Sequence, residues 1–255
     1  MGKKGPTLSK SDIARGLREL GLNKGDGVLV HSSLSSFGYV VGGANTVIDA
    51  LLEVVGEEGT ILVPTLTGTE HHGPTNPPVF DVKRTPCWTG RIPTAFMERP
   101  EARRSLHPTH SVAGLGPEIE SLLEGHADSL APCGLATPYY KLAAAGGHIL
   151  LIGVGQGSNT TLHTAEELAE VSYHMQKEPT DCIIIDYDGT RHTKQMFLHQ
   201  WGTPRQFERI DKELLDRGIM EMGQAGNSVL RLIRSMEMLE WVVDILRKEP
   251  RYLCE

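Results

Sequence analysis

The chain has 255 residues, of which 32 are acidic and 25 are basic, so its formal net charge is -7. Hydrophobic residues make up 39% of the chain and the mean hydropathy is -0.22, as is typical of a folded globular protein. No apolar run approaches the roughly 20 residues that a membrane-spanning helix needs. The negative charge argues against nucleic acid or an anionic membrane as a partner.

The N-terminal segment and the cysteines favour a cytoplasmic protein. Residues 1–7 start with basic side chains but are not followed by the apolar stretch of a secretory signal. Cys87, Cys133, Cys182 and Cys254 are far apart and form no Cys-x-x-Cys pair, so neither a zinc ribbon nor a redox motif is predicted.

The first 63 residues predict a helix and a β-α-β unit. Ser9 and Asp12 have the spacing of a capping box at the start of a helix over residues 9–20. A buried strand over 28–31 is followed by a helix from Ala44 and by a second strand over 60–63. A strand, a helix and a strand in this order predict parallel pairing of the two strands.

The remaining chain predicts further helices and strands around a long loop at residues 64–90. So long a connection is usually functional or disordered. We expect helices over 90–99, 117–124, 137–145, 164–175, 207–216 and 235–248, and strands over 111–115, 148–152 and 227–233. Residues 182–186 and 191–198 flank Asp188-Gly189 and predict an antiparallel hairpin.

These elements predict an α/β fold. We expect a mixed, partly parallel central sheet flanked by helices, with an added antiparallel hairpin. There is no internal repeat, low-complexity tract or clear linker, and 255 residues suit one α/β domain. We therefore predict a single domain over residues 1–255.

The stretch from Gly153 to Glu167 has a composition that favours ligand binding. It places a glycine-rich turn between a buried strand and a helix start, which is where α/β proteins often bind ligands. Its glycine spacing departs from the dinucleotide fingerprint, so a nicotinamide enzyme is only an alternative.

His163 is the candidate catalytic residue in this stretch. Glu166, Glu167 and Glu170 follow His163 by three, four and seven residues. On a helix, these spacings place the three carboxylates on the same face as His163. The helix start disfavours the imidazolium, and a carboxylate partner orients the ring. A structural histidine remains the alternative.

Other histidines offer weaker patterns. His107 and His110 are separated by Pro108, which prevents a helical metal pair, and His71 lies in the long loop. A metal-dependent hydrolase that uses these three histidines is an alternative hypothesis. His31 ends a strand before a serine-rich loop, which is either solvated or faces a polar ligand.

Three stretches in this order resemble the aminoglycoside 3-N-acetyltransferase family. They are His31-Ser-Ser-Leu-Ser-Ser-Phe-Gly38, Arg104-Ser-Leu-His-Pro-Thr-His-Ser-Val-Ala-Gly-Leu-Gly116, and Gly153 to Glu167. The resemblance implies a fold distinct from the Gcn5-related acetyltransferases. It also implies transfer of the acetyl group of acetyl-CoA to the 3-amino group of aminoglycoside antibiotics. We further expect no bound metal, and a monomer or homodimer.

The resemblance also assigns roles to individual residues. It implies that His163 is the catalytic histidine and that Glu166 is its acidic partner. Our hypothesis for the mechanism is a direct transfer without an acyl-enzyme, with His163 as the general base and Thr161 or Ser111 as candidate oxyanion donors. The further expected residues are His31, Ser32, Ser33, Leu34, Ser111 and Val112 for the cofactor, and Glu167, Glu170 and Asp81 for the polycationic substrate. An acetyltransferase of the same fold acting on another amine metabolite is the second hypothesis.

Overall fold

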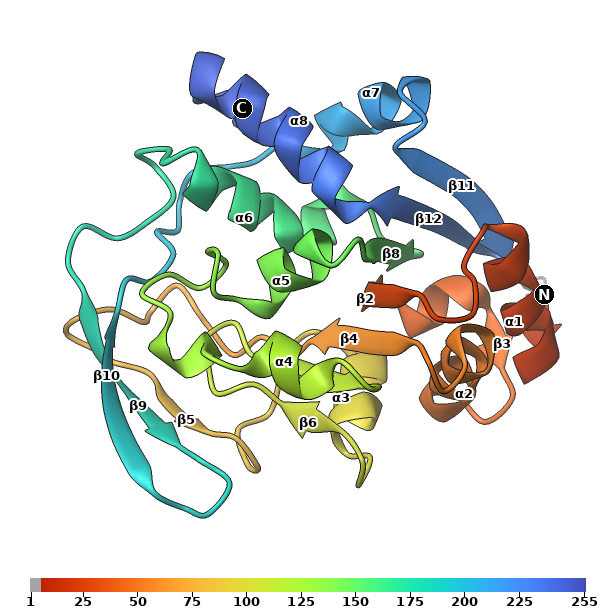
Figure 1. Ribbon diagram of the computed structural model, residues 1–255, viewed down its shortest axis with the longest axis horizontal. Helices are drawn as coiled ribbons and strands as arrows, with labels where there is room; N and C mark the ends of the chain where they lie inside the picture. The colour runs from red at the N-terminus through yellow and green to blue at the C-terminus, as the bar shows by residue number, and fades with distance from the viewer. Residues whose placement is uncertain (1–5) are drawn as a thin grey trace, which may run out of the picture.

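The computed structural model describes residues 6–255 and contains a seven-stranded mixed sheet (Figure 1). The basic segment at residues 1–5, part of the predicted N-terminal pattern, lies outside the described range. The strand order is β11-β12-β8-β2-β4-β7-β6. The bounds are β2 Gly27–Ser32, β4 Thr60–Pro64, β6 Arg103–Arg104, β7 Val112–Leu115, β8 His148–Ile152, β11 Met220–Ala225 and β12 Ser228–Arg234.

Helices cover both faces of this sheet (Figure 1). One face carries α1 Lys10–Glu19, α2 Ala44–Val55 and α3 Arg91–Met97. The other carries α4 Ile119–Leu123, α5 Pro138–Ala144, α6 Thr161–Leu168, α7 Asp211–Asp216 and α8 Ser235–Lys248.

The alternating residues of the central strands explain why both faces are covered. Val28 and Val30 point toward α1 and α2, whereas Leu29 between them points toward α4 and α5. All three are at most 1% exposed. A strand that is apolar on both faces is stable only between two layers of helices.

The parallel strands bring the residues of the site to one edge. β2 pairs in parallel with both β4 and β8, and Ser32 is the register partner of Ile152. The carboxyl ends of these strands therefore meet, and the chain leaves them at His31-Ser32, at Pro64 and at Gly153. The mixed sheet and the parallel pairing of β2 with β4 confirm the predictions.

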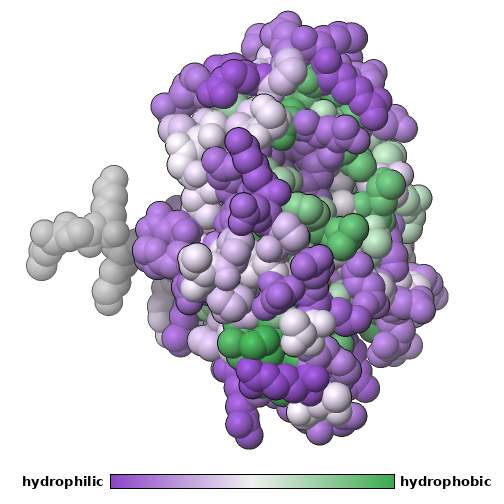
Figure 2. Space-filling model, turned by 90° about the vertical axis from the view of Figure 1, so that its left-hand side faces the viewer, coloured by the Kyte–Doolittle hydropathy of each residue, from purple (hydrophilic) through white to green (hydrophobic). Residues whose placement is uncertain are grey.

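The predicted hairpin is confirmed as β9 Thr180–Ile185 and β10 Arg191–Met196. It belongs to a separate three-stranded sheet, because β5 Val79–Asp81 from the long loop pairs in parallel with β9. This small sheet has its own apolar cluster, which includes Phe80 and Ile184. Figure 2 views the molecule from the side on which Figure 1 draws this sheet; polar residues cover most of this face, and hydrophobic residues form a patch near its centre.

The structure differs from the predicted elements in the bounds of α6 and in several short or edge strands that were not predicted. α6 begins three residues early and ends at Leu168, because Asn159 Oδ1 accepts a hydrogen bond from the N–H of Thr161 and Glu170 adopts a left-handed backbone. The edge strand β11 was not predicted, since its sequence Met-Glu-Met-Gly-Gln-Ala is largely polar. Short strands β1 Thr7–Leu8 and β3 Tyr39–Val40 pair beside the N-terminus of α1. Within residues 6–255, no helix is both long and apolar enough to cross a membrane.

Candidate active site

A cavity of about 600 Å³ opens at the carboxyl edge of the parallel strands. Such a volume suits a small-molecule ligand. Its walls come from the end of β2, both ends of the loop at 64–90, the glycine turn after β8, the start of α6 and the segment after β10. The lining residues that matter for chemistry are His31, Ser32, Trp88, His110, His163, His174, His199, Trp201 and Arg205.

His163 is placed on the first turn of α6 with its ring at the cavity wall. Its Nδ1 lies 2.7 Å from Glu166 Oε2, one helical turn later. The His163 side chain is 27% exposed, whereas that of Glu166 is 0% exposed. One nitrogen of the imidazole is therefore hydrogen-bonded to a buried carboxylate, and the ring lines the cavity.

Glu166 is held by three groups from three segments. Its Oε1 accepts a hydrogen bond from Arg205 Nε at 3.0 Å, and its Oε2 lies 3.0 Å from His174 Nδ1. Burial alone would raise the pKa of Glu166, but the hydrogen bonds with His163 and His174 outweigh burial and hold that pKa well below its usual range. The carboxylate is therefore charged at neutral pH.

The same contact sets the protonation of His163. Burial lowers the pKa of its imidazole, and the hydrogen bond and charge of Glu166 only partly offset this effect. The ring is consequently neutral at neutral pH, as a general base must be.

Further histidines extend from this pair along the cavity wall. The ring of His199 lies 4.8 Å from that of His163, 4.0 Å from that of His174 and 4.2 Å from that of His110, measured between centroids. Burial lowers the pKa of His199 and His110 well below the usual value, so both rings are neutral.

Two polar atoms at the end of β2 have no hydrogen-bond partner among residues 6–255. They are His31 Nε2 and Ser32 Oγ, both buried from bulk solvent on residues that line the cavity. Burial lowers the pKa of His31 to about 3, so its ring is neutral. Unpartnered buried polar atoms are costly, and a polar ligand in the cavity would satisfy them.

The family model for aminoglycoside 3-N-acetyltransferases matches residues 29–247. This chain belongs to that family. Aminoglycoside N(3)-acetyltransferase VII of Streptomyces paromomycinus is 37% identical, over 95% of this chain and 94% of its own length. The resemblance stated from the sequence motifs is thereby confirmed.

Two solved structures of aminoglycoside acetyltransferases share the fold. A histidine-to-alanine mutant of AAC(3)-IVa in complex with a gentamicin has a TM-score of 0.84 and 27% identity, covering 100% of this chain and 96% of that one. AAC-IIIb in a binary complex with CoASH has a TM-score of 0.80 and 26% identity, covering 96% and 98%. This family does not have the Gcn5-related fold, in agreement with the predicted fold class.

The acetyltransferase fold brings some of the predicted cofactor residues together and not others. His31 and Ser32 line the cavity, whereas Ser33 and Leu34 lie beyond it, at the start of a short 3-10 helix over Leu34–Phe37. Ser111 is fully buried, and its hydroxyl already donates to the Thr65 carbonyl at 2.7 Å. The roles of these residues in cofactor binding stay predictions.

Three other predicted residues lie behind or away from the lining. Val112 is fully buried in β7, and the hydroxyl of Thr161 at the start of α6 is buried without a hydrogen-bond partner in the described part of the chain. Asp81 accepts hydrogen bonds from the backbone of Lys83 and Arg84 at the end of β5. None of the three is among the residues that line the cavity.

The acidic residues after His163 separate because α6 is shorter than predicted. Glu167 is buried behind the histidines, where its Oε1 lies 3.1 Å from His199 Nε2 and accepts the Cys133 N–H at 3.0 Å. Glu170 follows the helix end and is exposed, so it does not share the face of His163. Binding of the substrate by Glu167, Glu170 and Asp81 stays a prediction.

The histidines proposed for a metal hydrolase do not form one group. His71 is exposed in the long loop, and His107 is fully buried with its Nδ1 accepting the N–H of His110 at 3.0 Å. The residues that could hold a metal ion within the described range are His110 with Cys133 and His199, and His163 with His174 and His199.

Sequence reasoning missed His174, His199, Arg205 and Trp201. They come from irregular segments before and after the small sheet, where no helical or strand spacing relates them to His163. The available signal was the unusual run His199-Gln-Trp-Gly-Thr-Pro-Arg205, which is polar and aromatic without periodicity.

Proposed function

We propose that this protein transfers the acetyl group of acetyl-CoA to the 3-amino group of aminoglycosides and thereby confers resistance. The observation that carries the proposal is the neutral His163, tied to the buried Glu166 and facing a cavity of suitable size. Membership of the family and the complexes of its relatives with CoASH and with a gentamicin support it.

His163 acts as the general base of a direct transfer. Its Nδ1–H donates to Glu166, so its Nε2 carries the lone pair that accepts a proton from the attacking amine. The new bond joins that amine nitrogen to the acetyl carbon, the carbon–sulfur bond breaks, and His163 passes its proton to the departing thiolate. Glu166 stabilises the imidazolium between the two proton transfers.

The cavity offers groups that fit acetyl-CoA at the end of β2. When bound, acetyl-CoA supplies an already activated acetyl group. Within the described part of the chain, His31 Nε2 and Ser32 Oγ lack hydrogen-bond partners and are available for the polar groups of acetyl-CoA. Ser32 lines the cavity and its hydroxyl is not engaged, whereas the Ser111 hydroxyl is engaged with Thr65, so we assign the developing oxyanion to Ser32.

Replacing His163 with glutamine tests the assignment of the base. The expected result is a loss of turnover by about 100- to 10,000-fold, because general base catalysis contributes that range. Free thiol release from acetyl-CoA with an aminoglycoside panel measures it. His192→Gln, on the hairpin and paired with Asp186, is the matched control and should retain turnover. Near-normal turnover of His163→Gln at normal folding would overturn the assignment.

A second candidate function rests on the charge of the cavity wall. Within residues 6–255, no aspartate or glutamate lines it, while the exposed aromatic rings of Trp88 and Trp201 do. This wall favours an amine with fewer positive charges and an apolar or planar group. The same panel should therefore include monoamines, and a higher kcat/KM for a monoamine than for every aminoglycoside would select this function.

A further inference from the structure

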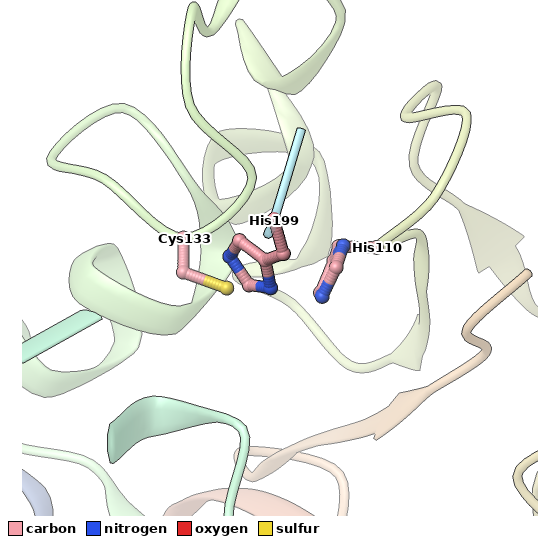
Figure 3. Close-up of side chains that lie close together, drawn as sticks. All are labelled: His110, Cys133 and His199. Carbon is pink, nitrogen blue, oxygen red and sulfur yellow. The ribbon is translucent and has the colours of Figure 1, made fainter. Parts of the chain in front are cut away.

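Three buried side chains from separate segments converge beside the cavity. His110 precedes β7, Cys133 precedes α5 and His199 follows β10. One donor atom of each lies within 4.8 Å of the donor atoms of the other two. Figure 3 shows His199 between the thiol of Cys133 and the ring of His110, with the three side chains directed toward one another.

We propose that His110, Cys133 and His199 bind a divalent transition-metal ion of the Zn²⁺ class. Two imidazoles and one thiolate form a donor set that zinc and similar borderline ions prefer. Tetrahedral bonds of about 2.0–2.3 Å place such donors about 3.3–3.6 Å apart, so small side-chain rotations complete the site. His110 and His199 line the cavity, which leaves the fourth ligand position on the cavity side.

The surroundings orient both histidines as ligands. Thr109 Oγ1 lies 2.9 Å from His110 Nδ1, and Glu167 Oε1 lies 3.1 Å from His199 Nε2. One nitrogen of each ring therefore makes a hydrogen bond with a neighbouring hydroxyl or carboxylate, and the other nitrogen is left to bind the ion. Metal-binding histidines usually have this arrangement. Glu167 also accepts the Cys133 N–H at 3.0 Å and so connects two of the three ligands.

The protonation states agree with a site that takes up metal with release of one proton. Both histidines are neutral, because burial lowers their pKa. Burial and the nearby carboxylates of Glu167 and Glu166 raise the pKa of Cys133, so the free side chain is a thiol. When the ion binds, the sulfur–hydrogen bond is replaced by a sulfur–metal bond and the proton leaves to solvent.

The second group, His163 with His174 and His199, is the weaker candidate. It has no thiolate, and the Nδ1 atoms of both His163 and His174 already face Glu166. The two groups share His199, so they compete for one ion. A sulfur ligand to the ion would identify the group with Cys133, and an ion without a sulfur ligand would identify the group with His163 and His174.

Titration of the metal-free full-length protein with Co²⁺, a spectroscopic substitute for Zn²⁺, tests the site. We expect one equivalent to bind with tetrahedral visible bands and a thiolate-to-cobalt charge-transfer band. Affinity should rise about tenfold per pH unit because one proton is released. Cys133→Ser should abolish the charge-transfer band and weaken binding more than about 100-fold, beyond the usual cost of losing an outer partner.

Two further variants keep the test decisive. Cys182→Ser replaces another buried cysteine, on β9 in the small sheet, and should bind cobalt like the parent. His110→Gln should keep the thiolate-to-cobalt band but bind cobalt with lower affinity. This variant tests the site even if Cys133→Ser does not fold. The proposal is overturned if no stoichiometric ion binds, or if Cys133→Ser keeps the band, or if only His163→Gln abolishes binding.

Discussion

Glu166 connects the chemistry of the site with its stability. The side chain is fully buried and shares its two oxygens among His163, His174 and Arg205. A buried carboxylate with these partners keeps the base oriented and compensates the positive charge of Arg205. Removing its charge leaves Arg205 uncompensated, which typically costs about 3–5 kcal/mol of unfolding free energy.

Glu166→Gln should change the pH profile as well as the rate. Burial lowers the pKa of His163, and Glu166 raises it in part, so loss of the carboxylate lowers that pKa further. The acid limb of kcat/KM, which falls as the base is protonated, should therefore move to lower pH, and kcat should fall at every pH because the imidazolium is less stable. An acid limb at unchanged pH, measured over a range in which the variant stays folded, would show that Glu166 does not act on the base.

At the scale of elements, regular patterns were predictable and irregular segments were not. The β8 strand at His148–Ile152 and the α8 helix at Ser235–Lys248 match their predicted bounds, because each is a clear apolar or amphipathic run. The polar edge strand β11 gave no such pattern. Within the site, His163 and Glu166 share a helix and their spacing was visible, whereas Arg205 meets them only through tertiary folding.

The turn between β8 and α6 sets the position of His163. Gly153 has φ of +63°, and a Cβ added there would overlap the side chain of Ser36. Gly153→Ala should therefore lower the unfolding free energy by about 3 kcal/mol, combining left-handed strain with overpacking. Gly146→Ala is the matched control, since its φ is +78° but no atom of residues 6–255 lies within 4 Å of the added Cβ, apart from its own chain neighbours. The expected loss of unfolding free energy for this control is only about 1–2 kcal/mol. If chemical denaturation shows equal losses of unfolding free energy for the two variants, the Ser36 side chain moves aside without destabilising the fold.

At the scale of the whole molecule, charge is distributed in a way that affects substrate capture. The chain carries a formal net charge of -7, yet burial lowers the pKa of His31, His110, His163 and His199 on the cavity wall, so these rings are neutral, and Arg205 is paired with Glu166. Attraction of a polycationic acceptor therefore arises from the surface field and from the rim of the cavity. Glu208 belongs to this rim, because its Oε1 accepts the N–H of Gly157, a lining residue, at 2.9 Å.

Salt and a rim substitution should affect capture in the same direction. Added salt screens exposed charges, so kcat/KM for an aminoglycoside should fall with ionic strength through KM while kcat is retained. Glu208→Gln should raise KM by about 1.5- to 5-fold, the range of an exposed ion pair, and should weaken the salt dependence. Glu221→Gln, exposed on the edge strand β11 and absent from the lining, should leave both unchanged. A KM that does not respond to salt or to Glu208→Gln would mean that the acceptor is not captured as a polycation, in line with an amine that carries fewer charges.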